Sequence, residues 1–387
     1  MLRSVPVTTY SVTGYVTMIT DLVRFDAYAR AMRAAIKPGA FVLEIGTGVG
    51  VFAVLARQLG ARRVVAVEPS DAITVARLIA RDNGVSDIEF IQALSTDISL
   101  SEKADVIVSD LRGVLPQMTG HIDAIVDARE RLLAPGGVLI PAADTLYAAV
   151  VEAPLVFGER TGAAVAAECG MRFDSLTRFA TNAWTRVDFR PDQLLTDAQA
   201  WATLDYRTAT TLDADGTLHW QAKRAGTAHG LAVWFDGELF GDAKLSNTPG
   251  GPELIYGNAF FPWPEPVAIN EGDEISVTIA VRHVADDHVW RWDSDVHRDG
   301  LTIAGFRQST FYGEPIVPSR LAHADATQKV SLNEDGELER FILDSMDGRT
   351  SNEQIARRLL EMFPRRFSRL NEALGAVGTL AQRVATQ

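Results

Sequence analysis

The chain has 387 residues but a single cysteine, Cys169. With no second cysteine, an internal disulfide is excluded, and we expect a packed thiol in a reducing, cytoplasmic compartment. No stretch reaches the roughly 18 unbroken apolar residues of a membrane span. The first residues, Met1 to Val16, also lack the apolar core of a signal peptide. We therefore expect no membrane partner.

Basic residues are also scarce, with 37 lysines and arginines against 50 aspartates and glutamates, for a net charge of -13. Nucleic-acid binding depends on clustered basic side chains that neutralise phosphates. We therefore expect no nucleic-acid partner and favour a cationic or small substrate. The length and the 47% hydrophobic content are sufficient for two or three packed domains.

Short β-branched runs alternate with helical stretches between Ala40 and Val151, a pattern typical of a parallel sheet flanked by helices. This pattern predicts a Rossmann-like α/β domain within residues 1–150. The expected strands are 41–45, 64–67, 88–91, 105–109 and 138–140, and the expected helices are 71–83 and 122–133.

After Pro154 short alternating runs are separated by turn signals such as Asp236-Gly237, which predicts an antiparallel β domain over 151–320. A helix expected over 163–179 belongs to an arm inserted near 158–190. Residues 325–387 are predicted to form a small helical domain, with three amphipathic helices from Glu337 onward. Thr350 and Glu353 have the spacing of a capping box.

A glycine cluster points to the ligand of the α/β domain. Gly46, Gly48 and Gly50 directly follow the first strand, where the backbone must turn sharply and approach a ligand. Glu68 ends the next strand, where a carboxylate can accept hydrogen bonds from ribose hydroxyls. The spacing lacks the separated third glycine of dinucleotide sites. Since Glu44 and Glu68 would repel a pyrophosphate but attract a sulfonium, the sequence favours S-adenosyl-L-methionine, with S-adenosyl-L-homocysteine as product.

Several further stretches agree in order and spacing with one known family: Met18-x-x-Asp21-x-x-Arg24, Val42 to Gly50, Glu68-Pro69-Ser70, Gln92 to Leu100, Cys169 to Asp174, Pro191 to Thr196 and His229 to Phe235. Together they resemble the protein arginine methyltransferases over about Tyr10 to Gly313. The resemblance implies a class I methyltransferase fold, a β-barrel-like second domain and a head-to-tail homodimer formed through the arm. It assigns cofactor binding to Tyr15, Met18, Arg24, Glu44, Gly46, Gly48, Gly50, Glu68, Pro69, Ser70, Thr96, Asp97 and Ser109, with Met18 covering the cofactor and Arg24 pairing with its carboxylate.

The chain departs from this family where the family binds the acceptor arginine. Two glutamates nine positions apart correspond here to Asp110 and Thr119, and the histidine of the family's Thr-His-Trp loop corresponds to Ile255. Arg112 adds a like charge, which disfavours a second guanidinium in a partly dry cleft. We predict three catalytic candidates, and the acceptor stays open among them. Asp110 orients an amine, imidazole or amide, Arg112 holds a carboxylate, and His121 serves either case.

The C-terminal residues resemble a second group, the small winged-helix peptide chaperones of pyrroloquinoline quinone biosynthesis. The similar stretches are Leu332 to Gly336, Phe341 to Thr350, Ile355-Ala356 and Leu359-Leu360. The resemblance implies that residues 325–387 bind the leader of a ribosomally made precursor peptide. The alternative is a helical cap that packs on the barrel.

The sequence thus predicts an S-adenosylmethionine-dependent methyltransferase that modifies a peptide or protein side chain, with a ribosomally synthesised precursor peptide as one candidate substrate. Three alternatives stay open. They are a protein arginine N-methyltransferase that uses Asp110, a small-molecule methyltransferase, and a cofactor-binding scaffold without catalysis. No metal site is predicted.

Overall fold

The computed structural model of the chain describes residues 12–117, 120–284, 287–318, 325–327 and 329–384. The chain divides into two compact units, Met1–Pro315 and Ile316–Gln387. The sequence placed the corresponding boundary between 320 and 325. No described helix is both long and apolar enough to cross a membrane.

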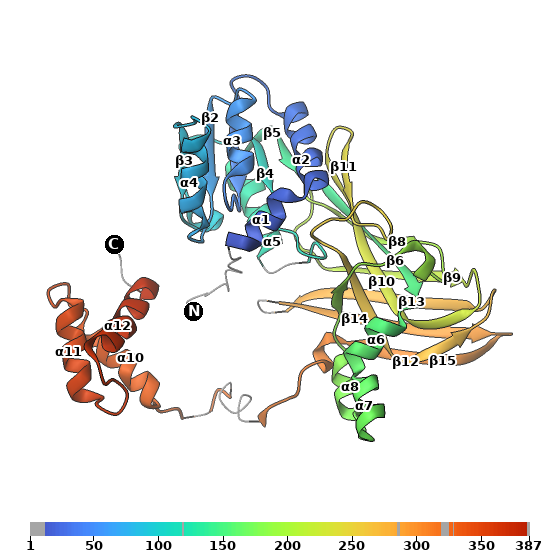
Figure 1. Cartoon of the computed structure of the whole chain (residues 1–387). Coiled ribbons are helices and arrows are strands. Elements are labelled where there is room, and N and C mark those ends of the chain that lie inside the picture. Colours follow the sequence, from blue (N-terminus) through green and yellow to red (C-terminus); the bar gives the residue numbers. More distant parts are fainter. Residues whose placement is uncertain (1–11, 118–119, 285–286, 319–324, 328, 385–387) are drawn as a thin grey trace. The chain divides into compact units, whose positions relative to one another are not determined.

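The N-terminal part of the first unit is built on a parallel five-stranded sheet with the order β3-β2-β1-β4-β5 (Figure 1). The strands are β1 Phe41–Ile45, β2 Arg63–Val67, β3 Ile88–Ile91, β4 Ala104–Ser109 and β5 Leu133–Ile140. The helical segments are α1 Val12–Thr20, α2 Leu22–Ala35, α3 Val51–Gln58, α4 Ala72–Asp82, η1 Ser95–Asp97, α5 His121–Asp127 and η2 Ala128–Leu132. Strand order reverses between β1 and β4, and ligands of such sheets bind at the carboxyl ends of the strands beside this point.

The Rossmann-like prediction is confirmed, with one difference near its end. The helix expected over 122–133 stops being α-helical at Asp127 and continues as the π-helical turn η2. Strand β5 then starts at Leu133, because Leu133 pairs with Ala104 of β4. The next pair is Val106 with Val138, so the register shifts over residues 134–137, where Gly136 has a φ of 75°.

The second part of the first unit consists of two antiparallel sheets, which confirms the predicted antiparallel β domain. One sheet has the order β7-β12-β10-β6-β8 with β11 beside β10, and the other has the order β15-β14-β13-β9. The strands are β6 Ala143–Val151, β7 Thr185–Val187, β8 Gln199–Asp205, β9 Ala214–Gln221, β10 Gly226–Phe240, β11 Ala243–Ser246, β12 Asn258–Ile269, β13 Glu274–Val284, β14 Asp287–Arg298 and β15 Leu301–Ser309, with short 3-10 turns η3 Pro191–Gln193 and η4 Thr310–Tyr312.

The helical arm contains α6 Pro154–Thr161, α7 Ala163–Cys169 and α8 Asp174–Ala180, which lie away from the parallel sheet in Figure 1 (green). The single helix predicted over 163–179 is wrong, because Gly170 adopts a left-handed conformation with φ of 63° and ends α7. Cys169, expected to be packed, is an exposed free thiol at this helix end.

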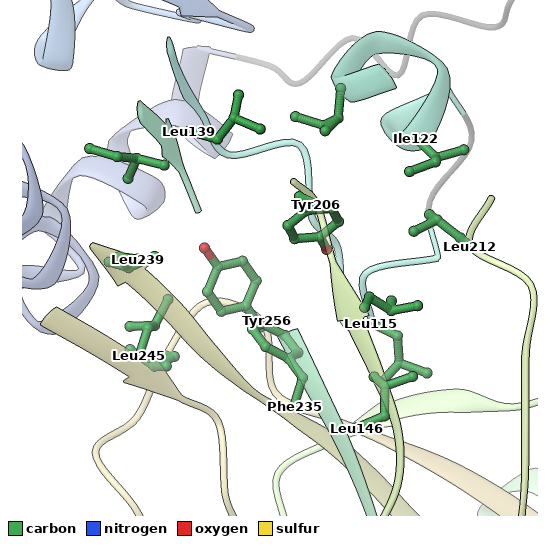
Figure 2. Packing of buried hydrophobic residues seen from close by; sticks show 14 of the residues in the cluster. Leu115, Ile122, Leu139, Leu146, Tyr206, Leu212, Phe235, Leu239, Leu245 and Tyr256 are labelled. Atoms are coloured by element: carbon green, nitrogen blue, oxygen red, sulfur yellow. The ribbon is translucent and has the colours of Figure 1, made fainter. Parts of the chain in front are cut away.

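A continuous apolar core joins the parallel sheet to the antiparallel ones. Figure 2 shows this junction, where Leu115, Ile122 and Leu139 face residues from the antiparallel sheets and their connecting loops. The latter residues are Leu146, Tyr206, Leu212, Phe235, Leu239, Leu245 and Tyr256. Because both parts share one core, the position of the antiparallel sheets relative to the loops at the carboxyl ends of the parallel strands is fixed by packing.

The second unit contains α10 Glu334–Ser345, α11 Asn352–Met362 and α12 Leu370–Val384, and its described residues form no strand. These helices enclose a core of their own, which includes Leu338, Ile342, Leu359 and Val377. The capping box of α11 is formed by Ser351 and Gln354, one residue later than predicted. Thr350 is engaged elsewhere, since its backbone N–H and its hydroxyl both donate to Asp347.

Candidate functional site

A cavity of about 250 Å³ lies at the carboxyl ends of β1, β2 and β4, where the reversal of strand order predicts a ligand site. Helices α1 and α2 and the loop before β12 contribute to its walls. The sequence-predicted site residues that line it are Tyr15, Met18, Arg24, Glu44, Gly46, Gly48, Glu68, Pro69, Ser109, Asp110, Arg112 and His121.

The loop after β1 requires glycine at two positions along the cavity. A Cβ atom on Gly48 would lie 2.5 Å from Cε1 of Tyr15, and one on Gly46 would lie 2.5 Å from Cδ2 of Leu111. Both glycines also have positive φ angles, 53° and 71°. Glycine at these positions therefore allows the sharp turn of the loop and the close packing of Tyr15 and Leu111 against its backbone.

The carboxylate of Glu68 is buried and oriented by the backbone. Its Oε2 accepts from the N–H of Gly48 and its Oε1 from the N–H of Ser70, both at 3.0 Å. Each oxygen keeps a further lone pair for ribose hydroxyls. Ser70 and Gly50 themselves do not line the cavity; Gly50 allows close packing against Ala76 of α4, which its Cβ would meet at 2.8 Å.

The carboxyl group of Glu44 lies at the base of the same cavity and accepts from the hydroxyl of Thr47 at 2.6 Å. Burial raises the pKa of Glu44 to about 8. A large fraction of this group is therefore protonated at neutral pH, and a positively charged ligand would favour its ionisation. This site suits a sulfonium or ammonium group better than a phosphate.

Two of the residues predicted to bind the cofactor, Thr96 and Asp97, lie outside the cavity. Thr96 and Asp97 are exposed in η1, whereas residues 93–95 line the wall. The guanidinium of Arg131 fixes this turn by donating to the carbonyls of Ser95 and Ile98. The residues of this segment that line the cavity therefore precede the predicted pair.

Asp110, at the end of β4, accepts hydrogen bonds on both carboxylate oxygens. Oδ2 accepts from Nε of Arg24 at 2.5 Å and from the hydroxyl of Tyr256 at 2.6 Å, while Oδ1 accepts from Nε of Arg112 at 3.3 Å. Burial alone would raise the pKa of Asp110, but the two guanidinium groups and the tyrosine hydrogen bond lower it to about 2. Asp110 is therefore ionised, and Arg24, expected on the cofactor carboxylate, pairs with it here.

Tyr256 is a site residue that sequence reasoning did not select. It lies in the loop before β12, and the signal was its place as the third residue of Leu254-Ile255-Tyr256, the stretch that resembles the family's Thr-His-Trp loop. The N–H of Ile255 donates to Oδ2 of Asp21 at 3.0 Å. This bond ties the loop to the start of α2 and holds the tyrosine hydroxyl beside Asp110.

Arg112 is fully buried and bridges the two parts of the unit. Its Nη1 donates to Oδ1 of Asp144 at 2.8 Å, and its Nη2 donates to the hydroxyl of Tyr28 at 2.7 Å. Asp144 also accepts from the hydroxyl of Tyr206 at 2.6 Å. A carboxylate substrate would have to compete with two aspartates for this guanidinium, so the arrangement does not favour the predicted carboxylate-binding role.

His121, at the start of α5, is buried and lies along the cavity. Its Nδ1 is 2.8 Å from the carbonyl oxygen of Pro116. Burial lowers the pKa of its imidazole below the ordinary value. Thr119, at the position of the family's second glutamate, lies outside the described residues.

The pairing of Arg112 with Asp144 predicts a specific pattern of stabilities. Arg112→Met should lower the free energy of unfolding by about 3–5 kcal/mol, because it leaves a buried carboxylate without its cation. The double variant Arg112→Met, Asp144→Ala should lose less free energy of unfolding than the single variant Arg112→Met. Urea unfolding measures both. As control, Arg172→Met breaks an exposed pair with Asp174 and should cost at most about 1 kcal/mol; equal losses in all three variants would contradict the network.

Comparisons with known proteins agree with this geometry. Residues 28–152 match the family described as ribosomal protein L11 methyltransferase, and residues 194–299 match the PRMT5 oligomerisation domain. The chain is 29% identical over 312 residues to protein arginine N-methyltransferase PRMT10 of Oryza sativa subsp. japonica, covering 70% of this chain and 81% of that protein. It is 27% identical over 270 residues to an arginine N(omega)-methyltransferase of Streptomyces achromogenes subsp. streptozoticus, covering 68% and 74%.

A solved structure shares the fold. The Trypanosoma brucei PRMT1 enzyme-prozyme heterotetrameric complex with AdoHcy superposes with a TM-score of 0.70 at 21% identity, over 76% of this chain and 96% of that one. Protein arginine N-methyltransferase 6 of Danio rerio is 30% identical over 236 residues, covering 58% of this chain and 68% of that protein. This chain therefore belongs to the protein arginine N-methyltransferase family and is an S-adenosylmethionine-dependent methyltransferase.

Proposed function

We propose that the chain methylates a guanidinium nitrogen of arginine, with Asp110 and Tyr256 as the acceptor-binding pair. The observation that carries this proposal is that the pair already holds a guanidinium, that of Arg24. The rings of Tyr28 and Phe52 flank the same group, with their centroids 5.6 and 5.5 Å from its central carbon. A carboxylate, a phenol and aromatic faces are the chemistry that recognises a guanidinium.

Cofactor binding frees this pair for a substrate. The glycine loop and Glu68 fit the adenosine part of S-adenosylmethionine, and ionised Glu44 fits its positive charge. The bound cofactor supplies an electrophilic methyl group on a sulfonium. In the family resemblance Arg24 pairs with the cofactor carboxylate; when it does so here, Oδ2 of Asp110 and the hydroxyl of Tyr256 lose their present partner and can accept the substrate guanidinium.

The named relatives support arginine as the chemical group. Those from Oryza sativa and Danio rerio are named for protein arginine, and the one from Streptomyces achromogenes is named for arginine without the word protein. We therefore propose a peptide or protein arginine as the acceptor, with free arginine as the small-molecule alternative. The buried commitment of Arg112 to Asp144 argues against a carboxylate acceptor.

The proposal predicts that Asp110→Asn lowers kcat on arginine peptides at least about 100-fold, because the amide lacks the charge that orients the guanidinium. Cofactor affinity, measured by calorimetry, should change less than about threefold, since the glycine loop and Glu68 are intact. Asp123→Asn, an exposed acid of α5 outside the cavity, is the matched control and should retain activity. Methyl transfer is followed by mass spectrometry. Tight cofactor binding by the wild-type chain without transfer to any arginine acceptor would refute the proposal and favour a scaffold role.

We also propose that the chain forms a homodimer through the arm. The arm exposes several large apolar side chains, which are Leu155, Val165, Met171, Leu176 and Phe179. Exposed apolar groups gathered on one projecting element are typical of an interface. The match of residues 194–299 to an oligomerisation domain supports self-association of the chain, and the exposed apolar groups are the support for the arm as its interface.

The dimer proposal predicts that Leu155→Glu shifts the chain from dimer to monomer in sedimentation velocity. Leu155 is 81% exposed, so the substitution removes little from the fold of the single chain. Leu301→Glu changes a comparably exposed leucine at the start of β15 and serves as the control. A monomeric wild-type chain, or an unchanged dimer in Leu155→Glu, would contradict the proposal.

For the second unit we propose leader-peptide recognition, consistent with a precursor-peptide substrate and a cytoplasmic location. Its support is that α10, α11 and α12 enclose their own core, as expected for an independently folded binding module. Winged-helix character stays a prediction.

This role predicts that Leu359→Ala selectively weakens the use of extended substrates. Loss of the buried leucine should cost about 2–5 kcal/mol, a large fraction of the stability of so small a unit. KM for arginine peptides that carry a long N-terminal extension should rise at least tenfold, while KM for the same core peptide without the extension stays constant. Met362→Ala, at a 62% exposed position of the same unit, is the control. An equal KM for both substrate lengths in wild type would refute leader recognition.

A further inference from the structure

Two buried polar atoms on the cavity wall have no hydrogen-bond partner among the described residues. They are Oγ of Ser109 and Nε2 of His121, and both residues line the same cavity as Asp110. Buried polar atoms are nearly always paired, because an unpaired one keeps the full cost of lost hydration. Two residues of the cavity lining thus keep hydrogen-bonding capacity that no described residue uses.

The hydrogen bond of the other ring nitrogen fixes the chemistry of Nε2. A carbonyl oxygen accepts and cannot donate, so Nδ1 of His121 carries the proton that it shares with the oxygen of Pro116. In the neutral ring Nε2 then has a free lone pair and is an acceptor. Burial lowers the pKa of His121. The positive charge of Arg112 lowers the pKa further, whereas the negative charges of Asp144 and Asp110 raise it.

We propose that His121 Nε2 is the second acceptor for the substrate guanidinium and takes up the proton that methyl transfer releases. This inference rests on the proposed function, since it concerns an arginine acceptor. Asp110 binds the guanidinium through charge, and the neutral imidazole binds it from the adjoining wall. His121 thereby replaces the second carboxylate that the family carries at the position of Thr119.

The step balances without a further reactant. The lone pair of the guanidinium nitrogen forms the new N–C bond as the S–C bond breaks, and the bonding pair stays on sulfur. The nitrogen then loses one proton to Nε2 of His121, and the imidazolium later releases it to solvent. Asp110 and Asp144, which both act electrostatically on His121, stabilise the imidazolium meanwhile.

The charges around His121 give the sign of the pH dependence. The groups that face it are Asp144, Arg112 and Asp110, with His288 of β14 and the ring of Tyr206 nearby. Only the neutral imidazole accepts, so kcat should fall as pH drops through the pKa of His121, which lies below its ordinary value of about 6.5. Asp110, with a pKa of about 2, does not titrate in that range.

The test is His121→Asn, because the side-chain amide can still donate to the oxygen of Pro116 but has no atom at the place of Nε2. The matched control is His288→Asn. His288 is also buried with an unpartnered Nε2, but it does not line the cavity. Thermal unfolding and cofactor affinity verify that both variants are folded; if His121→Asn is not, His121→Gln replaces it.

Three measurements follow: kcat on an arginine peptide from pH 5 to 8 (about the range of imidazole titration), the affinity of that peptide for the S-adenosylhomocysteine complex by calorimetry, and the imidazole titration by NMR. We expect His121→Asn to lower kcat about 100-fold or more, to remove the acidic limb and to weaken peptide binding about tenfold. His288→Asn should match wild type.

Two outcomes overturn the inference, and only the second of them also overturns the proposed function. Wild-type activity and an unchanged pH profile in His121→Asn would remove His121 from the reaction but leave arginine methylation intact. Absence of methyl transfer and of peptide binding in the wild-type chain itself would overturn the proposed function and this inference with it.

Discussion

The ion pairs of Asp110 determine how the rest of the site is arranged. Two guanidinium groups reach this carboxylate from different elements, Arg24 from α2 and Arg112 from the loop after β4. Arg112 also binds Asp144 on the first strand of the antiparallel sheets, so one chain of buried charges links both parts of the unit. Since each buried charge needs its partner, the position of the sheets, the start of α2 and the acceptor-binding wall depend on one another.

The cofactor half of the site could be predicted from the sequence because its determinants are local. Gly46 and Gly48 must turn the chain directly after β1, and Glu68 directly ends β2, so short spacing in sequence corresponds to closeness in space. The parallel sheet was equally predictable, because its central strands β1 and β2 are short, mainly apolar runs in which nearly every residue is buried. The direction of side chains within a turn was harder to predict from the sequence. Thr96 and Asp97 were therefore assigned to the cavity wall, which residues 93–95 form instead.

The acceptor half could not be predicted, because its partners are distant in the chain. Tyr256 lies 146 residues from Asp110, and Asp144 lies 32 residues from Arg112. Neither pairing follows from the periodicity or spacing of the sequence. The packed core at the junction brings the paired residues together. The sequence located Asp110, Arg112 and His121 on one loop, but which of them is free for a substrate depends on their partners, and those of Asp110 and Arg112 are distant in the chain.

The unusual residues of the acceptor half form one consistent electrostatic arrangement. Arg112 adds a positive charge beside Asp110, which taken alone would weaken guanidinium binding. Asp144 neutralises this charge by accepting from Nη1 of Arg112, while Nε of Arg112 stays on Oδ1 of Asp110. Once Arg24 turns to the cofactor, the remaining uncompensated charge is that of Asp110, which matches one guanidinium. A second carboxylate would then exceed the charge of the substrate, whereas the neutral imidazole of His121 accepts a hydrogen bond without adding charge. The same low dielectric that keeps this imidazole neutral strengthens the single ion pair on which acceptor binding depends.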